Sequence, residues 1–332
     1  MEQGNNMLKH YYPSGDLLII HPCMTPAGRS PIRNIFFFFI LFISLFQLSA
    51  CTYNSRTDSA ESTFVISVDR RIEPVGNFTN LLGDMVQTIQ SSDTFNNFIL
   101  FVHGRGKHPE KAFEKAILSN LESNYSAKVI MFNWPSWNGA LSFPEDQARS
   151  SADDFINVLR QLKSFKNNNP QLTNNIRFTL LTHSMGSLVL EQASKQGDLA
   201  TDLFDTLIIN SSASAGKGHA DWLNRIALSE NIYVTVNRDD SILGPAGARL
   251  AGRRLGKGLT SRSGEEFKLA DNTNYIDVTR TGVNHRYYIY PGMNNSTTLK
   301  VFYNRVLNGL PASLDRDNGI IKIERDRVYI LR

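Results

Sequence analysis

Ser184 is the residue of this sequence that is best suited to act as a nucleophile. It stands in the segment Thr182-His183-Ser184-Met185-Gly186, after the strand-like residues 177–181 and before residues 188–190, where an apolar helix face begins. A sharp turn between a strand and a helix exposes a serine hydroxyl and leaves the next backbone N–H free to bind an oxyanion. The pattern therefore predicts that Ser184 attacks a carbonyl carbon.

The pattern expected around a nucleophilic serine is complete on only one side of Ser184. Small side chains are favoured two positions before and after the serine, because the strand and helix backbones pass close together there. Gly186 meets this requirement, whereas Thr182 stands where glycine is usual. The alternative interpretation is that Ser184 only caps a helix that starts at Met185.

A nucleophilic serine needs a histidine that takes its proton and an acid that orients the histidine. With a nucleophile on a strand–turn–helix, the acid and then the histidine follow the serine along the chain. Of the seven histidines, six come too early: His10, His21, His103, His108, His183 and His219. We therefore predict by elimination that His285 is the base. The alternative is a loop histidine that is hydrogen-bonded to backbone.

The acid is expected directly after the buried strand predicted at residues 232–237. Asp239 and Asp240 follow that strand. We predict that Asp240 is the acid of the triad, and Asp239 is the alternative. Asp205 and Asp277 lie at the wrong ends of their strands or beside the wrong loop, which favours structural roles for both.

A second donor to the oxyanion is expected from the loop after an early strand. The apolar strand predicted at residues 98–102 leads into His103-Gly104-Arg105-Gly106. Glycines let the backbone approach a substrate carbonyl closely. We predict that the backbone N–H groups of Arg105 and Met185 bind the oxyanion, and that His103 and Gly104 brace the loop.

Short apolar runs alternate with helical patterns from residue 64 onward, which predicts a mostly parallel sheet covered by helices on both faces. The predicted strands are residues 64–68, 98–102, 128–133, 176–182, 206–210, 232–237 and 275–278. The predicted helices are residues 109–123, 145–166, 186–196, 220–229 and 297–308. Residues 167–175 are predicted to be a loop, and residues 320–331 a terminal strand or hairpin.

Two connections bear on access to the predicted site. Only residues 211–219 separate a predicted strand from the next helix at the usual place of a cap, so we expect no large cap domain. The glycine-rich basic residues 244–268 include Arg249, Arg253, Arg254, Lys257 and Arg262. This stretch either overhangs the site, where its basic residues could bind an anionic head group or a membrane surface, or forms a solvated loop.

The N-terminal region resembles a secretory signal. Residues 35–48 are almost entirely apolar, follow Arg29 and Arg33, and are shorter than the about 20 residues that span a membrane. The exit Leu48-Ser49-Ala50-Cys51 resembles a bacterial lipobox, so we predict that Cys51 is lipidated. The alternatives are an uncleaved signal anchor and a buried helix.

These observations predict the organisation of the chain. Residues 1–50 form the signal region, in which residues 1–23 are a misassigned start or a dispensable extension, because Met24 suits the signal better. Residues 51–63 form a lipidated tether, and residues 64–332 form one catalytic domain. We expect a lipoprotein of the bacterial cell envelope, at the outer membrane by preference, because Thr52 is not the aspartate that favours inner-membrane retention.

Composition excludes several classes of function. The 332 residues are 41% hydrophobic and 20% charged, as in ordinary globular proteins. A net charge of +4 is too small and too dispersed to indicate a nucleic-acid partner. Two cysteines, Cys23 and Cys51, cannot form a disulfide scaffold. We expect no metal and no cofactor.

Motifs that come in a particular order give the sequence a resemblance to a known group. They are HGRG at 103–106, Phe132-Asn133-Trp134-Pro135-Ser136, the segment around Ser184, Asp240-Ser241-Ile242-Leu243, Arg254-Leu255-Gly256 and His285-Arg286-Tyr287-Tyr288. This order resembles bacterial α/β-hydrolases that are mostly of unknown function. The resemblance implies the α/β-hydrolase fold, a hydrolase activity, and triad roles for Ser184, Asp240 and His285. The sequence departs from the group at residues 105–107 and at Asp239.

The expected activity is ester hydrolysis through an acyl-enzyme at Ser184. Small-molecule or lipid esters are the expected substrates, and the predicted membrane tether favours lipid or lysophospholipid esters. Thioester hydrolysis, amide hydrolysis and acyl transfer would use the same residues. The alternative from another class is a catalytically silent envelope lipoprotein that uses the fold for binding.

Overall fold

The computed structural model describes residues 62–332 except 70, 107–111, 140–141, 198, 245–251, 290–291, 294–295 and 324. The described residues belong to one compact unit, Asp58–Arg332. The predicted signal, the lipidation of Cys51 and most of the tether lie outside the described residues. No helix in the described ranges is long and apolar enough to span a membrane.

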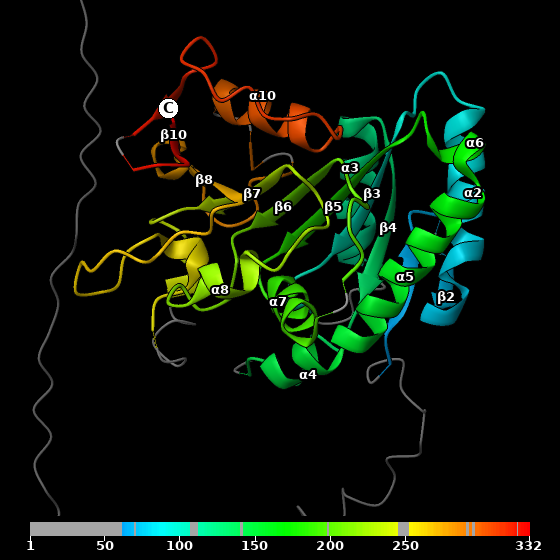
Figure 1. The fold of residues 1–332 in the computed structure, drawn as a ribbon, viewed down its shortest axis with the longest axis horizontal. Coiled ribbons are helices and arrows are strands. Elements are labelled where there is room, and N and C mark those ends of the chain that lie inside the picture. The colour runs from blue at the N-terminus through cyan, green and yellow to red at the C-terminus, as the bar shows by residue number, and fades with distance from the viewer. Residues whose placement is uncertain are drawn as a thin grey trace, which may run out of the picture. The chain divides into compact units, whose positions relative to one another are not determined.

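A ten-stranded sheet forms the centre of the unit, in the order β2-β1-β4-β3-β5-β6-β7-β8-β10-β9 (Figure 1). The pairs from β4 across to β10 are parallel, whereas β1 and β2 at one end and β9 at the other pair antiparallel. The strands are β1 (Phe64–Ser67), β2 (Ile72–Pro74), β3 (Asn97–Val102), β4 (Ala127–Asn133), β5 (Arg177–His183), β6 (Thr206–Asn210), β7 (Ile232–Val236), β8 (Thr273–Asp277), β9 (Ile320–Lys322) and β10 (Val328–Leu331).

Helices cover both faces of this sheet (Figure 1). They are α2 (Phe78–Gln90), α3 (Ala112–Tyr125), α4 (Glu145–Ser150), α5 (Ala152–Asn168), α6 (Pro170–Thr173), α7 (Gly186–Gln196), α8 (His219–Leu223) and α10 (Thr297–Val306). Strand side chains alternate between faces: in β5, Leu180 joins the core beneath α2, α5, α7 and α8, and Leu181 joins the core beneath α3 and α10. The predicted α/β fold, with a mostly parallel sheet between two helical layers, is confirmed.

The predicted strand boundaries agree with the structure to within two residues, but several helical predictions are wrong. The helix predicted at residues 145–166 is two helices, because Ser150 and Ser151 donate side-chain hydrogen bonds to the Gln147 carbonyl and end α4. The loop predicted at residues 167–175 contains the end of α5 and all of α6. Pro170 suits the first turn of α6, because the missing N–H would have no acceptor there.

The sheet extends at both ends beyond the strands that were clearly predicted from the sequence. Strand β2 and helix α2 were not predicted. The weak alternation at residues 320–331 is a hairpin of β9 and β10, and β10 pairs in parallel with β8. Residues 211–218, all of which are described, join β6 directly to α8, so no cap domain is inserted there.

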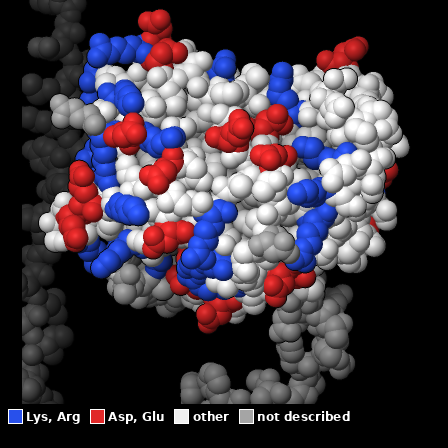
Figure 2. Space-filling model, viewed as in Figure 1, with Lys and Arg blue, Asp and Glu red and all other residues white. Residues whose placement is uncertain are grey.

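The surface carries both signs of charge. On the face seen in Figure 2, Lys and Arg side chains are interspersed with Asp and Glu side chains. This mixture agrees with the near balance of 35 basic and 31 acidic residues in the whole sequence.

The carboxyl ends of β3, β5 and β7 meet at one edge of the sheet, and the loops that follow them hold the candidate site.

Candidate active site

Ser184 occupies a strained turn between β5 and α7. Its φ angle is 52°, in the left-handed region that L residues rarely adopt. The backbone around it is held by three hydrogen bonds: the Ser184 N–H donates to Asn210 O at 3.0 Å, and the N–H groups of Ser187 and Ala213 donate to Ser184 O. The residue that caps α7 is Met185, without a side-chain capping bond. Helix capping therefore does not account for Ser184.

Glycine is required on one side of the turn. A Cβ atom on Gly186 would lie 2.5 Å from the carbonyl oxygens of both Val102 and His103. On the other side, Thr182 is fully buried within the sheet, and its hydroxyl has no hydrogen-bond partner among the described residues. The backbone at the start of α7 thus passes close to the end of β3 at Gly186, and this contact does not involve Thr182. A threonine is therefore tolerated at position 182.

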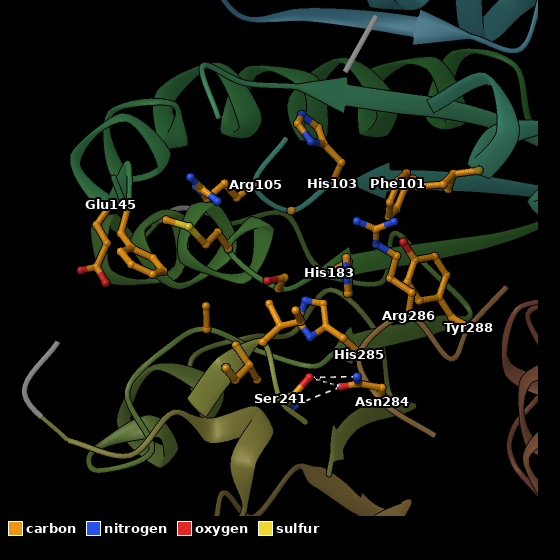
Figure 3. A pocket seen from close by; sticks show the side chains of 18 residues that line it. Phe101, His103, Arg105, Glu145, His183, Ser241, Asn284, His285, Arg286 and Tyr288 are labelled. Atoms are coloured by element: carbon orange, nitrogen blue, oxygen red, sulfur yellow. Dashed lines mark hydrogen bonds between the residues drawn. The ribbon is translucent and has the colours of Figure 1, made fainter. Parts of the chain in front are cut away.

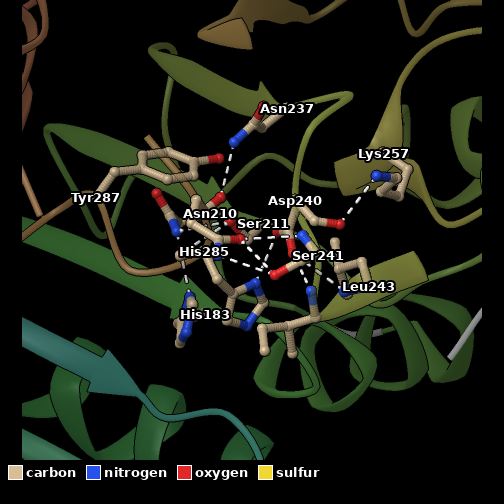
Figure 4. Close-up of polar contacts among 12 residues, drawn as sticks. His183, Asn210, Ser211, Asn237, Asp240, Ser241, Leu243, Lys257, His285 and Tyr287 are labelled. Atoms are coloured by element: carbon tan, nitrogen blue, oxygen red, sulfur yellow. Dashed lines mark hydrogen bonds and ion pairs between the residues drawn. The ribbon is translucent and has the colours of Figure 1, made fainter. Parts of the chain in front are cut away.

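His285 and Asp240 form a buried, hydrogen-bonded pair (Figure 4). The Nδ1 atom of His285 lies 2.7 Å from Oδ2 of Asp240, and Asp240 is completely buried. The other carboxylate oxygen, Oδ1, accepts the N–H groups of Ile242 at 2.9 Å and Leu243 at 3.0 Å. Because an ionised carboxylate only accepts, the imidazole carries its proton on Nδ1, and Nε2 is left as the basic atom.

Two loops are bonded together so that this pair holds its geometry. The Asn237 side chain donates to the carbonyls of Val283 at 2.8 Å and Asn284 at 2.7 Å. The Lys257 ammonium donates to the Asp240 carbonyl at 2.9 Å. Asp239, the alternative acid, is exposed, and its N–H donates to the Asn237 side chain. The structure therefore brings Asp240, and not Asp239, to His285.

Ser184, His285, Arg105 and Met185 all line one pocket of about 580 Å³. Much of its wall is apolar: Phe101, Ile117, Phe143, Met185, Ala213, Ile242, Leu243 and Tyr288. Figure 3 shows Glu145 and Arg105 toward one end, Phe101 and Tyr288 toward the other, and His285 between them. Of the lining residues, Ser184, His285, Arg105, Met185, His103 and Gly104 were predicted from the sequence to be site residues, and no role in the site was predicted for the rest of the apolar wall. Several lie in the motifs that carried the resemblance.

The loop after β3 packs on a buried tryptophan. The His103 ring stacks on Trp134 with ring centroids 5.7 Å apart, and Trp134 Nε1–H donates to the His103 carbonyl at 2.9 Å. Burial lowers the pKa of His103 to about 4, so this ring stays neutral at neutral pH. The Arg105 guanidinium lies over the Trp137 ring, 4.2 Å from its centroid, and donates to the Gly139 carbonyl. The loop is therefore fixed by its own side chains.

His183 is a third buried histidine that lines the pocket, with His285 and His103. Its ring centroid lies 4.7 Å from that of His285, and its Nδ1 atom lies 3.2 Å from the Asn210 amide nitrogen. The Asn210 oxygen already accepts the hydroxyls of Thr235 and Tyr303, so the amide nitrogen faces the imidazole as a donor. Burial, and then the neighbouring His285 and Arg286, lower the pKa of His183 well below its ordinary value. His183 is thus held neutral beside the candidate base.

Arg254 does not do what the sequence predicted. It was expected either to bind an anion or to be solvated, but it is 5% exposed. Its guanidinium lies 3.3 Å from the Glu145 carboxylate and donates to the Ala213 carbonyl at 3.0 Å. Arg254 thus joins the segment between β7 and β8 to α4, and also to the loop after β6. Arg249 lies outside the described residues.

Among the described residues, no group of three or more His, Cys, Asp or Glu side chains is arranged so that it could hold a metal ion.

Solved structures that are similar to this chain share low sequence identity with it. They include carboxyl esterase 2 from the fungus Tuber melanosporum, at 12% identity over 78% of this chain and 90% of that chain, with a TM-score of 0.36. A predicted hydrolase from Thermoplasma acidophilum matches at 13% identity over 61% and 84%, with a TM-score of 0.31. A serine hydrolase without a lid from Xanthomonas campestris matches at 14% identity over 56% and 72%, also with a TM-score of 0.31.

The family assignment comes from the sequence itself. No curated protein matches this chain. A family model described as alpha/beta hydrolase of unknown function (DUF900) matches residues 82–289, which run from α2 through the loop of His285. This range is more than half of the 332 residues. The chain therefore belongs to this family of α/β hydrolases.

Proposed function

We propose that the protein is a serine hydrolase that cleaves carboxylic esters through an acyl-enzyme on Ser184. The observation that carries the proposal is the buried hydrogen bond between His285 Nδ1 and Asp240 Oδ2, in a pocket that Ser184 also lines. A histidine whose tautomer is fixed by a buried acid, beside a serine on a strained strand–helix turn, is the arrangement that activates a hydroxyl.

The proposed reaction begins with His285. Its Nε2 atom takes the proton of Ser184 Oγ while Oγ bonds to the ester carbonyl carbon. The backbone N–H groups of Met185 and Arg105 bind the resulting oxyanion, because N–H groups at a helix start lack intrahelical acceptors and the loop of Arg105 lines the same pocket. The proton then passes from Nε2 to the leaving alkoxide. Water, deprotonated by His285, releases the acid and restores the serine.

An apolar acyl group suits the pocket. Its volume of about 580 Å³ lies within the range of roughly 300–1,000 Å³ that is usual for small-molecule sites. Side chains such as Phe101, Phe143 and Leu243 offer apolar contact. An ester with an aliphatic or aromatic acyl group therefore fits the wall better than a strongly polar one.

Anchoring to the cell envelope is part of the proposal. Its support is the sequence alone: the apolar residues 35–48, the preceding basic residues and the small residues before Cys51. Metabolic labelling with a fatty acid should mark the wild-type protein and should fail to mark a Cys51→Ala variant. Equal labelling of the two proteins would contradict the lipidation of Cys51.

A substrate panel tests the enzymatic proposal. The wild type, Ser184→Ala and the matched control Asp239→Asn would be assayed on acyl esters, thioesters and amides of graded chain length. We expect ester hydrolysis by the wild type and by Asp239→Asn, and a loss of at least about 1,000-fold in kcat for Ser184→Ala. A folded wild type that hydrolyses nothing would instead support a catalytically silent binding protein.

A further inference from the structure

The folded unit begins at the same edge of the sheet as Ser184. Strand β1 runs antiparallel to β4, and its first residue, Phe64, pairs with Asn133, the last residue of β4. Through β4 and β3, which are parallel to β5, this register places Phe64 level with His183 at the end of β5. The chain that precedes Phe64 therefore leaves from the edge that holds the pocket.

The separation along this edge is small. The order β1-β4-β3-β5 puts three strand spacings between the start of β1 and the strand of the nucleophile. At about 4.8 Å per spacing, this amounts to roughly 14 Å. Had β1 run parallel to β4, which has seven residues, the chain would have started at the opposite edge, roughly 23 Å away along the strands.

The stretch of chain between the predicted anchor and Phe64 is short. Residues 51–63 can extend to at most about 45 Å. Either form of anchor considered for residues 35–51, a lipid on Cys51 or an uncleaved apolar segment, attaches the unit through this stretch. With either form, the point at which the anchor is attached to the unit lies at the pocket edge and not at the opposite edge.

The rim of the pocket carries an exposed apolar side chain. Ile242 is 58% exposed, follows the acid Asp240 by two residues and also lines the pocket. Isolated exposed apolar residues are common on protein surfaces. Among the described residues, however, only one other large apolar side chain is exposed, Ile72 at 51% on the edge strand β2. Ile242 therefore extends the apolar wall of the pocket outward to the surface.

We infer that the pocket edge of the sheet docks on the phospholipid bilayer to which the chain is attached, and that the substrates are acyl esters of lipids in that bilayer. The inference rests on the proposed ester hydrolysis and anchoring. Ile242 enters the interfacial region of the bilayer, and the acyl chain of a lipid passes from there into the apolar pocket. The start of β1 at the same edge places the attachment point on the side of the pocket mouth.

A ratio of two activities tests the substrate. Full-length protein in phosphatidylcholine and phosphatidylglycerol vesicles would hydrolyse a fluorogenic lysophospholipid ester in the same bilayer and, separately, soluble p-nitrophenyl butyrate. We expect Ile242→Asp to lower the ratio of lipid to soluble activity by about tenfold, and the matched Ile72→Asp to leave it unchanged. The ratio cancels any common effect on catalysis. An unchanged ratio in Ile242→Asp, or an equal fall in both variants, would overturn the inference.

A labelling experiment tests the orientation without requiring catalysis. Ile242→Cys at the pocket rim and Asp93→Cys, exposed shortly before β3 at the opposite edge, would each carry an environment-sensitive fluorophore in a Cys23→Ser background. We expect quenching by bilayer-embedded quenchers at residue 242 and none at residue 93. Equal quenching, no quenching, or quenching at residue 93 alone would contradict docking through this edge, even if ester hydrolysis is established.

Discussion

The imidazole of His285 lies 2.7 Å from the carboxylate of Asp240, although 45 positions separate the two residues in the sequence. They meet because β7 and β8 are parallel neighbours, so that the loops after both strands leave the same edge of the sheet. The Asn237 side chain then joins these loops by bonding to the backbone at 283 and 284. The geometry of the pair thus depends on the order of strands in the sheet and on the hydrogen bonds between the two loops, which include those of Asn237.

The first prediction compares the two adjacent aspartates. Asp240→Asn should lower kcat for ester hydrolysis by about 10,000-fold, because an amide no longer fixes the required histidine tautomer. Asp239→Asn should stay within a factor of about two of the wild type, because Asp239 is exposed and does not contact His285. Steady-state kinetics on one soluble ester decide the matter. A large loss in Asp239→Asn with little loss in Asp240→Asn would contradict the assignment.

The second prediction concerns two glycines in helices. Gly186→Ala should lower the free energy of unfolding by about 3 kcal/mol, because its Cβ would meet two backbone oxygens at 2.5 Å. Gly83→Ala in α2 should raise the unfolding free energy by roughly 0.5–1 kcal/mol, because its Cβ meets only the Phe165 ring at 3.8 Å. Denaturant titrations measure both. Equal effects of the two variants would refute the close approach at the turn.

Strands were easier to predict from this sequence than helices. The central strands are apolar on both faces, so a short apolar run marks each one, and only the boundaries shifted. Helix α2 was not predicted, although the sequence carries a signal for it. Its buried residues have helical spacing: Leu81, Leu82, Met85, Val86 and Ile89. The short strand β2 has little burial, so no apolar signal marks it.

Some residues of the candidate site could be predicted from the sequence, and others could not. The turn at Ser184 and the histidine after a late strand come in the order along the chain that such a site requires, so the sequence pattern could predict them. The contacts of Arg254 with Glu145 and of Asn210 with His183 join elements far apart in the chain, and nothing in local spacing indicates them. A buried arginine and a solvated one also look alike in a basic, glycine-rich stretch.

The third prediction is a dependence of stability on pH. The pKa of His103 is about 4 in the folded protein, because of burial, and about 6.5 when unfolded. The unfolded chain therefore binds this proton first as pH falls. The contribution of neutral His103 to stability is complete above about pH 6.5 and is lost toward pH 4, by roughly 3 kcal/mol in total.

A variant isolates this contribution. The unfolding free energy of His103→Gln should fall less between pH 6.5 and pH 4 than that of the wild type, by roughly the same 3 kcal/mol. Guanidinium titrations at several pH values provide the comparison. Parallel pH profiles for the two proteins would show that His103 is not held neutral by burial.

The fourth prediction concerns the ion pair between the buried Arg254 and the half-buried Glu145 at the pocket wall. Arg254→Met should lower the unfolding free energy by about 3 kcal/mol, because it leaves the Glu145 carboxylate without its nearest cation. Arg149→Met is the control: its side chain is 33% exposed and lies 3.9 Å from Glu145 and 3.4 Å from Glu191. Because Glu191 keeps Lys195 as a partner, the loss of Arg149 should cost less than about 1 kcal/mol. Thermal and denaturant unfolding test the difference. An equal or larger loss for Arg149→Met would contradict the role given to Arg254.

Covalent labelling of Ser184 tests the central claim most directly. Wild-type protein treated with a fluorophosphonate should gain the mass of one phosphonyl adduct, mapped to the peptide that contains Ser184. Ser184→Ala should gain none, and Asp240→Asn should react far more slowly, because its histidine no longer activates the serine. A folded wild type that stays unmodified, or an adduct that forms equally on Ser184→Ala, would contradict a nucleophilic serine at this position.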